Sequence, residues 1–337
     1  MKALALYGIG DLRYEETPIP KRNDDEVLLK VRAVGICGSD IPRVFDKGTY
    51  NFPTIIGHEF AGEIVEANDN SLIGKKASVF PLIPCQKCEA CQNFHYAQCK
   101  NYDYYGSRRN GAMAEYIAVK KQNLSFIPNG VTFEEAAMNE PAAVAVHALK
   151  KSDVKPNDTV LIYGIGTIGL IFAQIARASG VKNITLVGRT KEKIQFAKKL
   201  NFLNVIDKNI EKLNTNPCAD VCVEGTGDPE ALNDCAILAK NFGKIICLGN
   251  PLKEMTFSQD AYWKILRKEL SLLGVWNSNF NYIENDWKDA LLAVKENKID
   301  LKSLITHKFL LKDYKKAFEM MKNKSELYCK VMFVMEE

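Results

Sequence analysis

TVLIYGIGTIG, residues 159–169, decides the fold of this 337-residue chain. Thr159–Tyr163 is a short apolar run of the kind that forms a buried strand, and a helix-like sequence follows it. Gly164, Gly166 and Gly169 have the GxGxxG spacing, which permits a tight turn and lets a pyrophosphate approach the backbone where the helix begins. The alternative is a tight glycine turn that binds no ligand. Because these glycines join a strand to a helix, we predict a dinucleotide-binding turn.

From this strand and turn onward, strand-like and helix-like runs alternate. The helix-like runs are expected to end near Ser179, Leu200 and Lys240. The strand-like runs are TVLIYGIG, NITLVGR, NVID, DVCVEGTG, KIICLGN and SLLGVW. This alternation is typical of a doubly wound parallel sheet, so we predict an α/β Rossmann domain with six strands over residues 142–276.

Residues 1–141 have a different pattern. Short apolar runs such as Glu26–Val34 and Gly62–Val65 are bounded by Gly, Asp and Asn, which favours a β-rich domain. Beyond residue 276 we expect helices near Trp287–Glu296 and Lys312–Lys322 and a final strand in CKVMFVM. A chain of this length suggests two domains. Since the pattern changes again after Trp276, we predict that residues 277–337 return to the domain formed by residues 1–141.

The composition is that of an ordinary globular protein, with 47% hydrophobic and 26% charged residues. The net charge of +4 and the lack of a long basic run argue against a nucleic-acid partner. The N-terminal stretch Met1–Glu16 has neither the apolar core nor the cleavage site of a signal peptide. Glycines and Gln174 interrupt the most apolar stretch, Thr159–Ala178, so we expect no membrane segment and a cytoplasmic location.

Four of the ten cysteines lie within fifteen residues. They are Cys85, Cys88, Cys91 and Cys99. Four thiolates in one loop suit a closed, tetrahedral structural zinc site that leaves no position for a substrate. The alternatives are free or disulfide-paired cysteines and an iron–sulfur cluster. In the absence of a secretion signal, the tight spacing favours a metal site.

Cys37, His58 and Glu140 are far apart in the sequence, and nothing local shows that they meet. If they do, a thiolate, an imidazole and a carboxylate would hold a catalytic zinc with one open position. Glu59 could be a fourth ligand or lie just behind the ligands, and Asp40 could orient His58 by accepting its second N–H. Taken singly, each of these residues is more simply explained by packing in the core.

The second strand of the predicted Rossmann domain ends in Gly188-Arg189. A site for NAD usually has an acid there, which binds the ribose hydroxyls. Glycine removes that carboxylate and Arg189 can pair with a 2′-phosphate, so we predict a preference for NADP over NAD. The alternative is that Arg189 stacks on the adenine and NAD is used. The candidate cofactor-binding residues are Gly164, Gly166, Thr167, Ile168, Gly169, Gly188, Arg189, Gly225, Gly249 and Trp276.

Together these motifs resemble the zinc-dependent medium-chain alcohol and polyol dehydrogenases along essentially the whole chain. The residues that carry the resemblance are Gly35–Asp40, Gly57–Glu59, the four cysteines, Asn139–Pro141 and Gly164–Gly169. The match is closest to polyol dehydrogenases that act on galactitol 1-phosphate, because of Cys37–Arg43, Tyr102–Arg109 and Lys264–Leu270. The resemblance implies a GroES-like catalytic domain, a Rossmann domain and a homodimer or homotetramer.

The resemblance also implies roles for single residues. Cys37, His58 and Glu140 match the catalytic zinc ligands, with Glu59 in or beside the ligand set. The clustered cysteines match the structural zinc ligands, so two zinc ions per subunit are expected. Ser39 matches the residue that relays the substrate proton.

The expected reaction is hydride transfer between a sugar alcohol and the nicotinamide ring, with zinc acting as a Lewis acid on the substrate hydroxyl. Ser39 would pass the proton outward. Pro42 stands where many relatives have a histidine, which leaves the outer end of the proton relay undefined.

The substrate is expected to be a polyol phosphate such as galactitol 1-phosphate, because guanidinium groups bind phosphate in a fork. The candidate substrate contacts are Arg43, Tyr50, Ser107, Arg108 and Arg109. For each arginine the alternative is a charged surface loop or a salt bridge within the domain. Alternative functions are a dehydrogenase of an unphosphorylated polyol, a secondary alcohol or L-threonine, and a non-catalytic binding protein that kept the fold.

Overall fold

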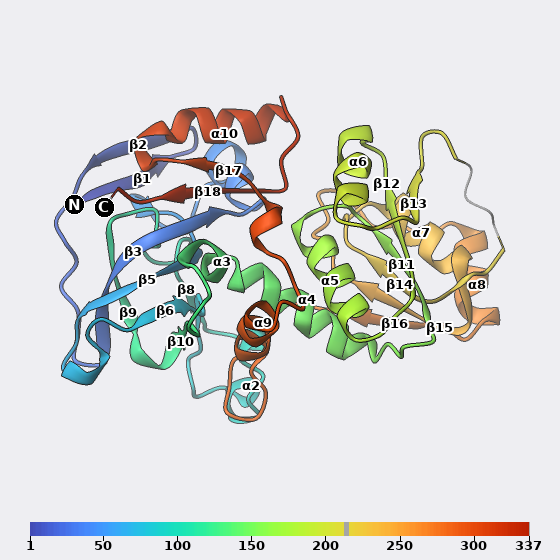
Figure 1. Cartoon of the computed structure of the whole chain (residues 1–337), viewed down its shortest axis with the longest axis horizontal. Helices are drawn as coiled ribbons and strands as arrows, with labels where there is room; N and C mark the ends of the chain where they lie inside the picture. Colours follow the sequence, from blue (N-terminus) through green and yellow to red (C-terminus); the bar gives the residue numbers. More distant parts are fainter. Residues whose placement is uncertain (212–215, 337) are drawn as a thin grey trace. The chain divides into compact units, whose positions relative to one another are not determined.

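The structure is a computed structural model that describes residues 1–211 and 216–336. It contains two compact units, Met1–Ala143 with Asn279–Glu337 and Val144–Ser278. The domain limits expected from the sequence, after residues 141 and 276, lie two residues earlier. Each unit has its own sheet and its own core, so the units are described in turn (Figure 1).

A seven-stranded sheet forms the centre of the first unit (Figure 1). Six of its strands run in the order β10-β6-β5-β3-β18-β17, and β9 pairs with β3. The strands are β3 (Glu26–Ile36), β5 (Glu59–Glu66), β6 (Lys76–Val79), β9 (Tyr116–Lys120), β10 (Leu124–Phe126), β17 (Ile305–Phe309) and β18 (Lys330–Val334). The C-terminal segment therefore supplies two strands of the sheet that the N-terminal segment begins.

Smaller elements surround this sheet. The strands β1 (Lys2–Gly8), β2 (Asp11–Glu16) and β4 (Thr54–Ile55) form a second sheet, and β7 (Leu82–Ile83) pairs with β8 (Asp103–Tyr104). The helices are α1 (Asp40–Pro42), α2 (Glu89–Gln92), α3 (Phe133–Ala137), α9 (Asp286–Lys295) and α10 (Tyr314–Asn323). The helix α4 (Asn139–Ser152) begins in this unit, and its residues from Val144 onward belong to the second. The core joins β1, β3, β5, β18 and α10 through side chains such as Leu6, Val31, Phe60, Phe318 and Phe333.

The second unit is a six-stranded, all-parallel sheet with the order β13-β12-β11-β14-β15-β16. Its strands are β11 (Thr159–Tyr163), β12 (Asn183–Gly188), β13 (Val205–Asp207), β14 (Ala219–Glu224), β15 (Ala239–Cys247) and β16 (Ser271–Gly274). Its helices are α5 (Thr167–Ala178), α6 (Lys191–Lys199), α7 (Pro229–Leu238) and α8 (Gln259–Arg267). Figure 1 shows α5 and α6 on one face of the sheet and α7 and α8 on the other.

These two architectures confirm the predicted α/β fold class, with a β-rich domain and a six-stranded Rossmann sheet. One boundary differs from the expectation. The strand β15 begins at Ala239, five residues before the run KIICLGN, because Ala239 pairs with Ala219 ahead of a β-bulge. Within residues 1–211 and 216–336, no helix is both long enough and apolar enough to cross a membrane.

Candidate active site and cofactor site

The four clustered cysteines converge in the loop around α2. Their sulfurs lie 3.9 Å apart for Cys85 and Cys91, 3.6 Å for Cys88 and Cys91, and 3.8 Å for Cys88 and Cys99. A tetrahedral zinc with Zn–S bonds of about 2.3 Å separates its sulfurs by about 3.8 Å, so the four thiols fit this ion. The backbone N–H groups of Cys91 and Lys100 lower the pKa of the Cys88 thiol to about 6, which favours a thiolate ligand.

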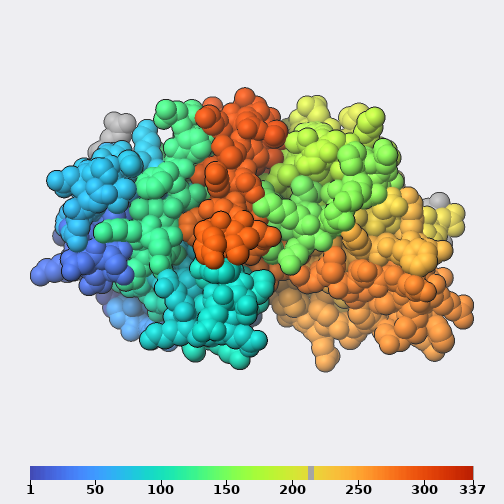
Figure 2. Space-filling model, turned by 90° about the horizontal axis from the view of Figure 1, so that it is seen from below, coloured from blue at the N-terminus to red at the C-terminus, as the bar shows by residue number. Residues whose placement is uncertain are grey.

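The cysteine loop packs against the segment that leads into α9. The Asn281 side chain donates a hydrogen bond to the Phe94 carbonyl at 3.0 Å, and the rings of Phe94 and Tyr282 lie 4.5 Å apart. Figures 1 and 2 show the two segments side by side, with the loop in cyan and the C-terminal segment in orange. A structural metal here would hold in place a loop that has few apolar residues of its own.

A second cluster lies where three neighbouring strands of the large sheet begin or end. Antiparallel pairing places Gly35 of β3 opposite Glu59 of β5, and Ile36 opposite Val331 of β18. Cys37 follows β3 directly and His58 precedes β5, so the sheet register brings their side chains together. The ligand atoms of Cys37, His58 and Glu59 all lie within 4.8 Å of one another.

Glu59 is 1% exposed and its Oε2 atom lies 2.5 Å from the Nζ atom of Lys330. Lys330 also donates to the Ile36 carbonyl at 3.5 Å. A Cβ atom at Gly35 would lie 2.3 Å from Glu59 Oε2, so only glycine leaves room for this carboxylate. Glu59 therefore reaches the cluster as half of a buried ion pair.

Asp40 contacts both Cys37 and His58 and positions them. Its carboxylate is fully buried, accepts the Cys37 N–H at 3.0 Å and lies 3.5 Å from His58 Nδ1. Arg43 donates to the same carboxylate at 2.8 Å and lies 3.4 Å from His58 Nδ1. This arrangement fixes the imidazole and leaves its other nitrogen available for a metal, which is the orienting role expected for Asp40.

Glu140, at the start of α4, is outside the group of three converging ligands. Desolvation raises the pKa of Glu140 to about 7, although the neighbouring His58 lowers it. Burial, Glu59 and Asp40 likewise raise the pKa of the Cys37 thiol to about 12. Desolvated acids gathered around one point are costly to ionise unless a cation joins them, so thiol, imidazole and carboxylate together fit a zinc ion.

Ser39 lies two residues beyond Cys37, with its backbone N–H 3.5 Å from the Cys37 sulfur. Its hydroxyl does not cap α1, although Ser39 occupies the N-cap position. Tyr104 lies on the other side of the cluster, where its ring meets that of His58 edge-on at 5.8 Å. Burial and Glu140 raise the pKa of Tyr104, so its hydroxyl stays protonated.

The candidate substrate residues occupy different places. Arg108 lies between two tyrosine rings, with its guanidinium 4.3 Å from the centres of both Tyr50 and Tyr102. Tyr102 in turn packs edge-on against Tyr104, at 6.2 Å. Ser107 is 6% exposed, and its carbonyl accepts the Tyr50 N–H at 3.3 Å.

Arg109, expected as a substrate contact, is engaged in ion pairs. It lies 3.8 Å from Glu26 and 3.5 Å from Asp103. It lines a groove together with Glu26, Lys21 and Met1, and that groove contains none of the converging ligands. The salt-bridge alternative that the sequence left open therefore describes Arg109 better than a contact beside the metal cluster.

In the second unit, the glycine turn has the geometry that a dinucleotide needs. Gly164 has a φ of +108°, and a Cβ atom at Gly169 would lie 2.1 Å from the Gly164 carbonyl oxygen. Gly166 is the N-cap of α5, where an added Cβ would meet nothing within 4 Å. The open space and the helix N-terminus at this point fit a pyrophosphate, with Thr167 and Ile168 in the first turn of α5.

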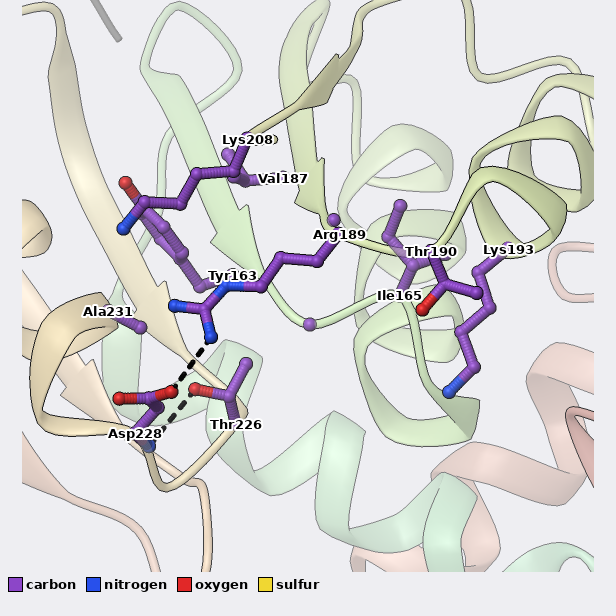
Figure 3. Close-up of a pocket in the computed structure, with 12 residues that line it drawn as sticks. Tyr163, Ile165, Val187, Arg189, Thr190, Lys193, Lys208, Thr226, Asp228 and Ala231 are labelled. Atoms are coloured by element: carbon purple, nitrogen blue, oxygen red, sulfur yellow. Dashed lines mark hydrogen bonds and ion pairs between the residues drawn. The ribbon is translucent and has the colours of Figure 1, made fainter. Parts of the chain in front are cut away.

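A pocket opens beside this turn, at the carboxyl edge of the sheet (Figure 3). Gly188 and Arg189 line it, as does Tyr163. A Cβ atom at Gly188 would lie 2.6 Å from Ile165 Cδ1, so the Ile165 side chain packs closely against this glycine. In Figure 3 the Arg189 guanidinium points across the pocket to Asp228.

The remaining cofactor candidates lie along the same edge. The Gly225 carbonyl would be 3.1 Å from a Cβ atom at Gly164, and Gly249 packs against the Gly227 backbone with no space for a side chain. Trp276 follows β16 and is 56% exposed. The two glycines make close backbone contacts, but neither they nor Trp276 are among the residues that line the pocket.

Sequence reasoning missed Lys330 and Tyr104. Lys330 could have been noticed as a charged residue at the start of the otherwise apolar run Lys330–Val334, where a buried partner is required. Tyr104 gave no comparable indication, because its position depends on the pairing of β8 with β7.

Comparison with known proteins defines the class to which this fold and these clusters belong. Residues 23–129 match the alcohol dehydrogenase GroES-like domain, and residues 167–296 match the zinc-binding dehydrogenase family. The chain belongs to the zinc-containing medium-chain dehydrogenases, and it is a zinc-dependent, NAD(P)-dependent alcohol or polyol dehydrogenase.

Individual relatives match along almost the whole chain. The chain is 32% identical to galactitol 1-phosphate 5-dehydrogenase of Escherichia coli K12, over 94% of this chain and 95% of that protein. It is 29% identical to the sorbitol dehydrogenase of Bacillus subtilis, over 95% and 93%. The crystal structure of the Escherichia coli galactitol-1-phosphate dehydrogenase superposes with a TM-score of 0.91 at 31% identity, covering 99% of this chain and all of the other.

Proposed function

We propose that this enzyme transfers a hydride between a polyol phosphate, such as galactitol 1-phosphate, and NADP. The observation that supports a phosphorylated substrate is the environment of Arg108. Among the described residues no carboxylate pairs with it, its Nε atom is buried without a hydrogen-bond partner, and two tyrosine rings hold its guanidinium in place. A preorganised guanidinium without a counter-charge suits a phosphate. The relative that acts on galactitol 1-phosphate supports this substrate class.

The residues in and around the metal cluster would have different roles in the reaction. A zinc ion held by Cys37, His58 and either Glu59 or Glu140 would supply a Lewis acid that lowers the pKa of the substrate hydroxyl. Asp40 holds His58 in the orientation that binding requires. Because the Ser39 hydroxyl does not cap α1, it can accept the proton of the substrate hydroxyl and pass it to solvent. Pro42 cannot take part in this relay.

Replacing Arg108 with glutamine is expected to raise KM for the polyol phosphate roughly tenfold to a hundredfold, the value of a hydrogen bond to a charged group. KM for the unphosphorylated polyol should change little. Steady-state kinetics on the two substrates measure the difference. Arg109→Gln is the matched control, because Glu26 and Asp103 already engage that guanidinium. Equal effects of Arg108→Gln on both substrates would contradict phosphate recognition and favour an unphosphorylated polyol, a secondary alcohol or L-threonine.

The proposed preference for NADP rests on two neighbouring residues. At the end of β12, Gly188 offers no carboxylate to repel a 2′-phosphate. Arg189 supplies a guanidinium to the same pocket, and its side chain is 45% exposed and thus accessible to a ligand. A guanidinium and a phosphate can form two parallel hydrogen bonds, which a ribose hydroxyl cannot.

We also propose that the enzyme is a homodimer or a higher homo-oligomer built on β16. Among the described strands, β16 pairs only with β15, so its outer edge is free, and Leu272 on this strand is 39% exposed. An open edge with apolar side chains is a ready site for pairing with a second copy. Leu272→Lys is expected to shift the mass in sedimentation experiments toward the monomer. Leu203→Lys, at a residue 83% exposed outside the strands, should not. An unchanged mass for Leu272→Lys would exclude this edge as the interface.

A further inference from the structure

Two carboxylates occupy the place where a 2′-phosphate would bind Arg189. Arg189 Nη1 lies 3.1 Å from Asp228, and Arg189 Nη2 lies 2.6 Å from Glu230. Asp228 lies in the segment between β14 and α7, and Glu230 lies in the first turn of α7. Figure 3 shows Asp228 reaching Arg189 across the pocket. Before the cofactor binds, the guanidinium is therefore neutralised from both sides.

The two acids are held very differently. Asp228 is the N-cap of α7, where it accepts the Glu230 N–H at 3.0 Å, and its side chain is 25% exposed. Glu230 lies one residue into the helix and its side chain is 59% exposed. An exposed ion pair is screened by water and contributes little, whereas a capping carboxylate is costly to remove. Glu230 is thus the easier of the two to displace.

Glu230 also has a second cation available. Lys208 Nζ lies 2.8 Å from the Glu230 carboxylate and also pairs with Asp234. The hydrogen bond from Lys208, more than the charge of Arg189, lowers the pKa of Glu230. If Glu230 leaves Arg189, its charge remains compensated, so the exchange leaves no isolated ion in the pocket.

We propose that Glu230 is a specificity-determining residue, which a 2′-phosphate replaces on Arg189 while Asp228 and Lys208 stay in place. When the bound cofactor has a 2′-hydroxyl in place of the phosphate, the ion pair between Arg189 and Glu230 remains intact. Discrimination between the two cofactors therefore depends on competition between two anions for one guanidinium, and not on Arg189 alone. This inference rests on the proposed role of Arg189 in binding NADP.

The test compares adenosine 2′,5′-bisphosphate with 5′-AMP, which lacks the 2′-phosphate, by titration calorimetry of the zinc-loaded enzyme. Glu230→Gln removes the competing charge and is expected to strengthen bisphosphate binding about threefold to fivefold, the value of an exposed ion pair. Binding of 5′-AMP should stay the same. Arg189→Gln should weaken bisphosphate binding at least tenfold, and adding Glu230→Gln to that variant should then have no effect.

Glu192→Gln is the matched control, because Glu192 is an exposed acid in the first turn of α6, close to Arg189 in the chain. An equal gain from Glu192→Gln, or a gain from Glu230→Gln that persists without Arg189, would reduce the effect to general electrostatics and overturn the proposal. Weaker binding of both ligands to Glu230→Gln would make Glu230 a ribose contact instead. If Arg189→Gln weakens binding of the bisphosphate but Glu230→Gln has no effect, the proposed competition is wrong and the NADP assignment stands. If Arg189→Gln changes neither ligand, the NADP assignment fails.

Discussion

Replacing Cys37 with alanine is expected to lower kcat by about three orders of magnitude, because a Lewis acid contributes several kcal/mol to the transition state. Cys37 provides the thiolate of the cluster, and His58 and Glu59 are too few to hold the ion alone. Metal analysis should show about one zinc per chain in place of about two, since the four-cysteine loop is unaffected. Binding of the cofactor, measured separately, should remain.

Cys222→Ala is the control for this experiment, because Cys222 is a buried thiol of the second unit and is outside both metal clusters. A chelator that removes the ion should reproduce the loss of turnover in the unmodified enzyme, and added zinc should restore it. Full activity of a demonstrably metal-free enzyme would contradict the proposed mechanism.

Features encoded by neighbouring residues could be predicted from the sequence. The run Thr159–Gly169 alone predicts a strand, a turn and a helix, because the backbone freedom of glycine and the apolar pattern act locally. The loop Cys85–Cys99 likewise contains all of its ligands, and the thiols converge as expected. For such features, the functional residues and the spacing that brings them together lie in one short segment of the chain.

Features that depend on sheet register could not be predicted. Glu59 and Lys330 are 271 residues apart in the chain. They meet because β5 and β18 both pair with β3, one on each side of it. For the same reason the sequence could not decide between Glu59 and Glu140 as a metal ligand. The alternation of charge along single strands contains no information about which strands become neighbours.

The ion pair between Lys330 and Glu59 should be essential for stability. Replacing Lys330 with methionine keeps much of the side-chain volume but leaves the carboxylate of Glu59, 1% exposed, without its partner. Breaking one side of a buried pair costs about 3–5 kcal/mol. For a domain of this size we expect the melting temperature to fall by at least about 6 °C. Differential scanning calorimetry measures the change.

Lys312→Met is the matched control, since Lys312 pairs with Glu336 at the surface and should cost less than about 0.5 kcal/mol. Lys330→Arg should retain part of the stability, because it keeps the charge.

The pH dependence of this pair has a definite sign. Burial opposes the charge of Lys330, but Glu59 and Cys37 outweigh it, so the pKa of Lys330 is raised above 10.5. A lysine with a raised pKa in the folded state contributes stability that is complete below its unfolded pKa and is lost as pH rises through the folded value. The difference between wild type and Lys330→Met should therefore be constant near neutrality and shrink only in strongly alkaline solution. A difference that disappears near pH 7 would mean that Lys330 does not carry its charge in the folded enzyme.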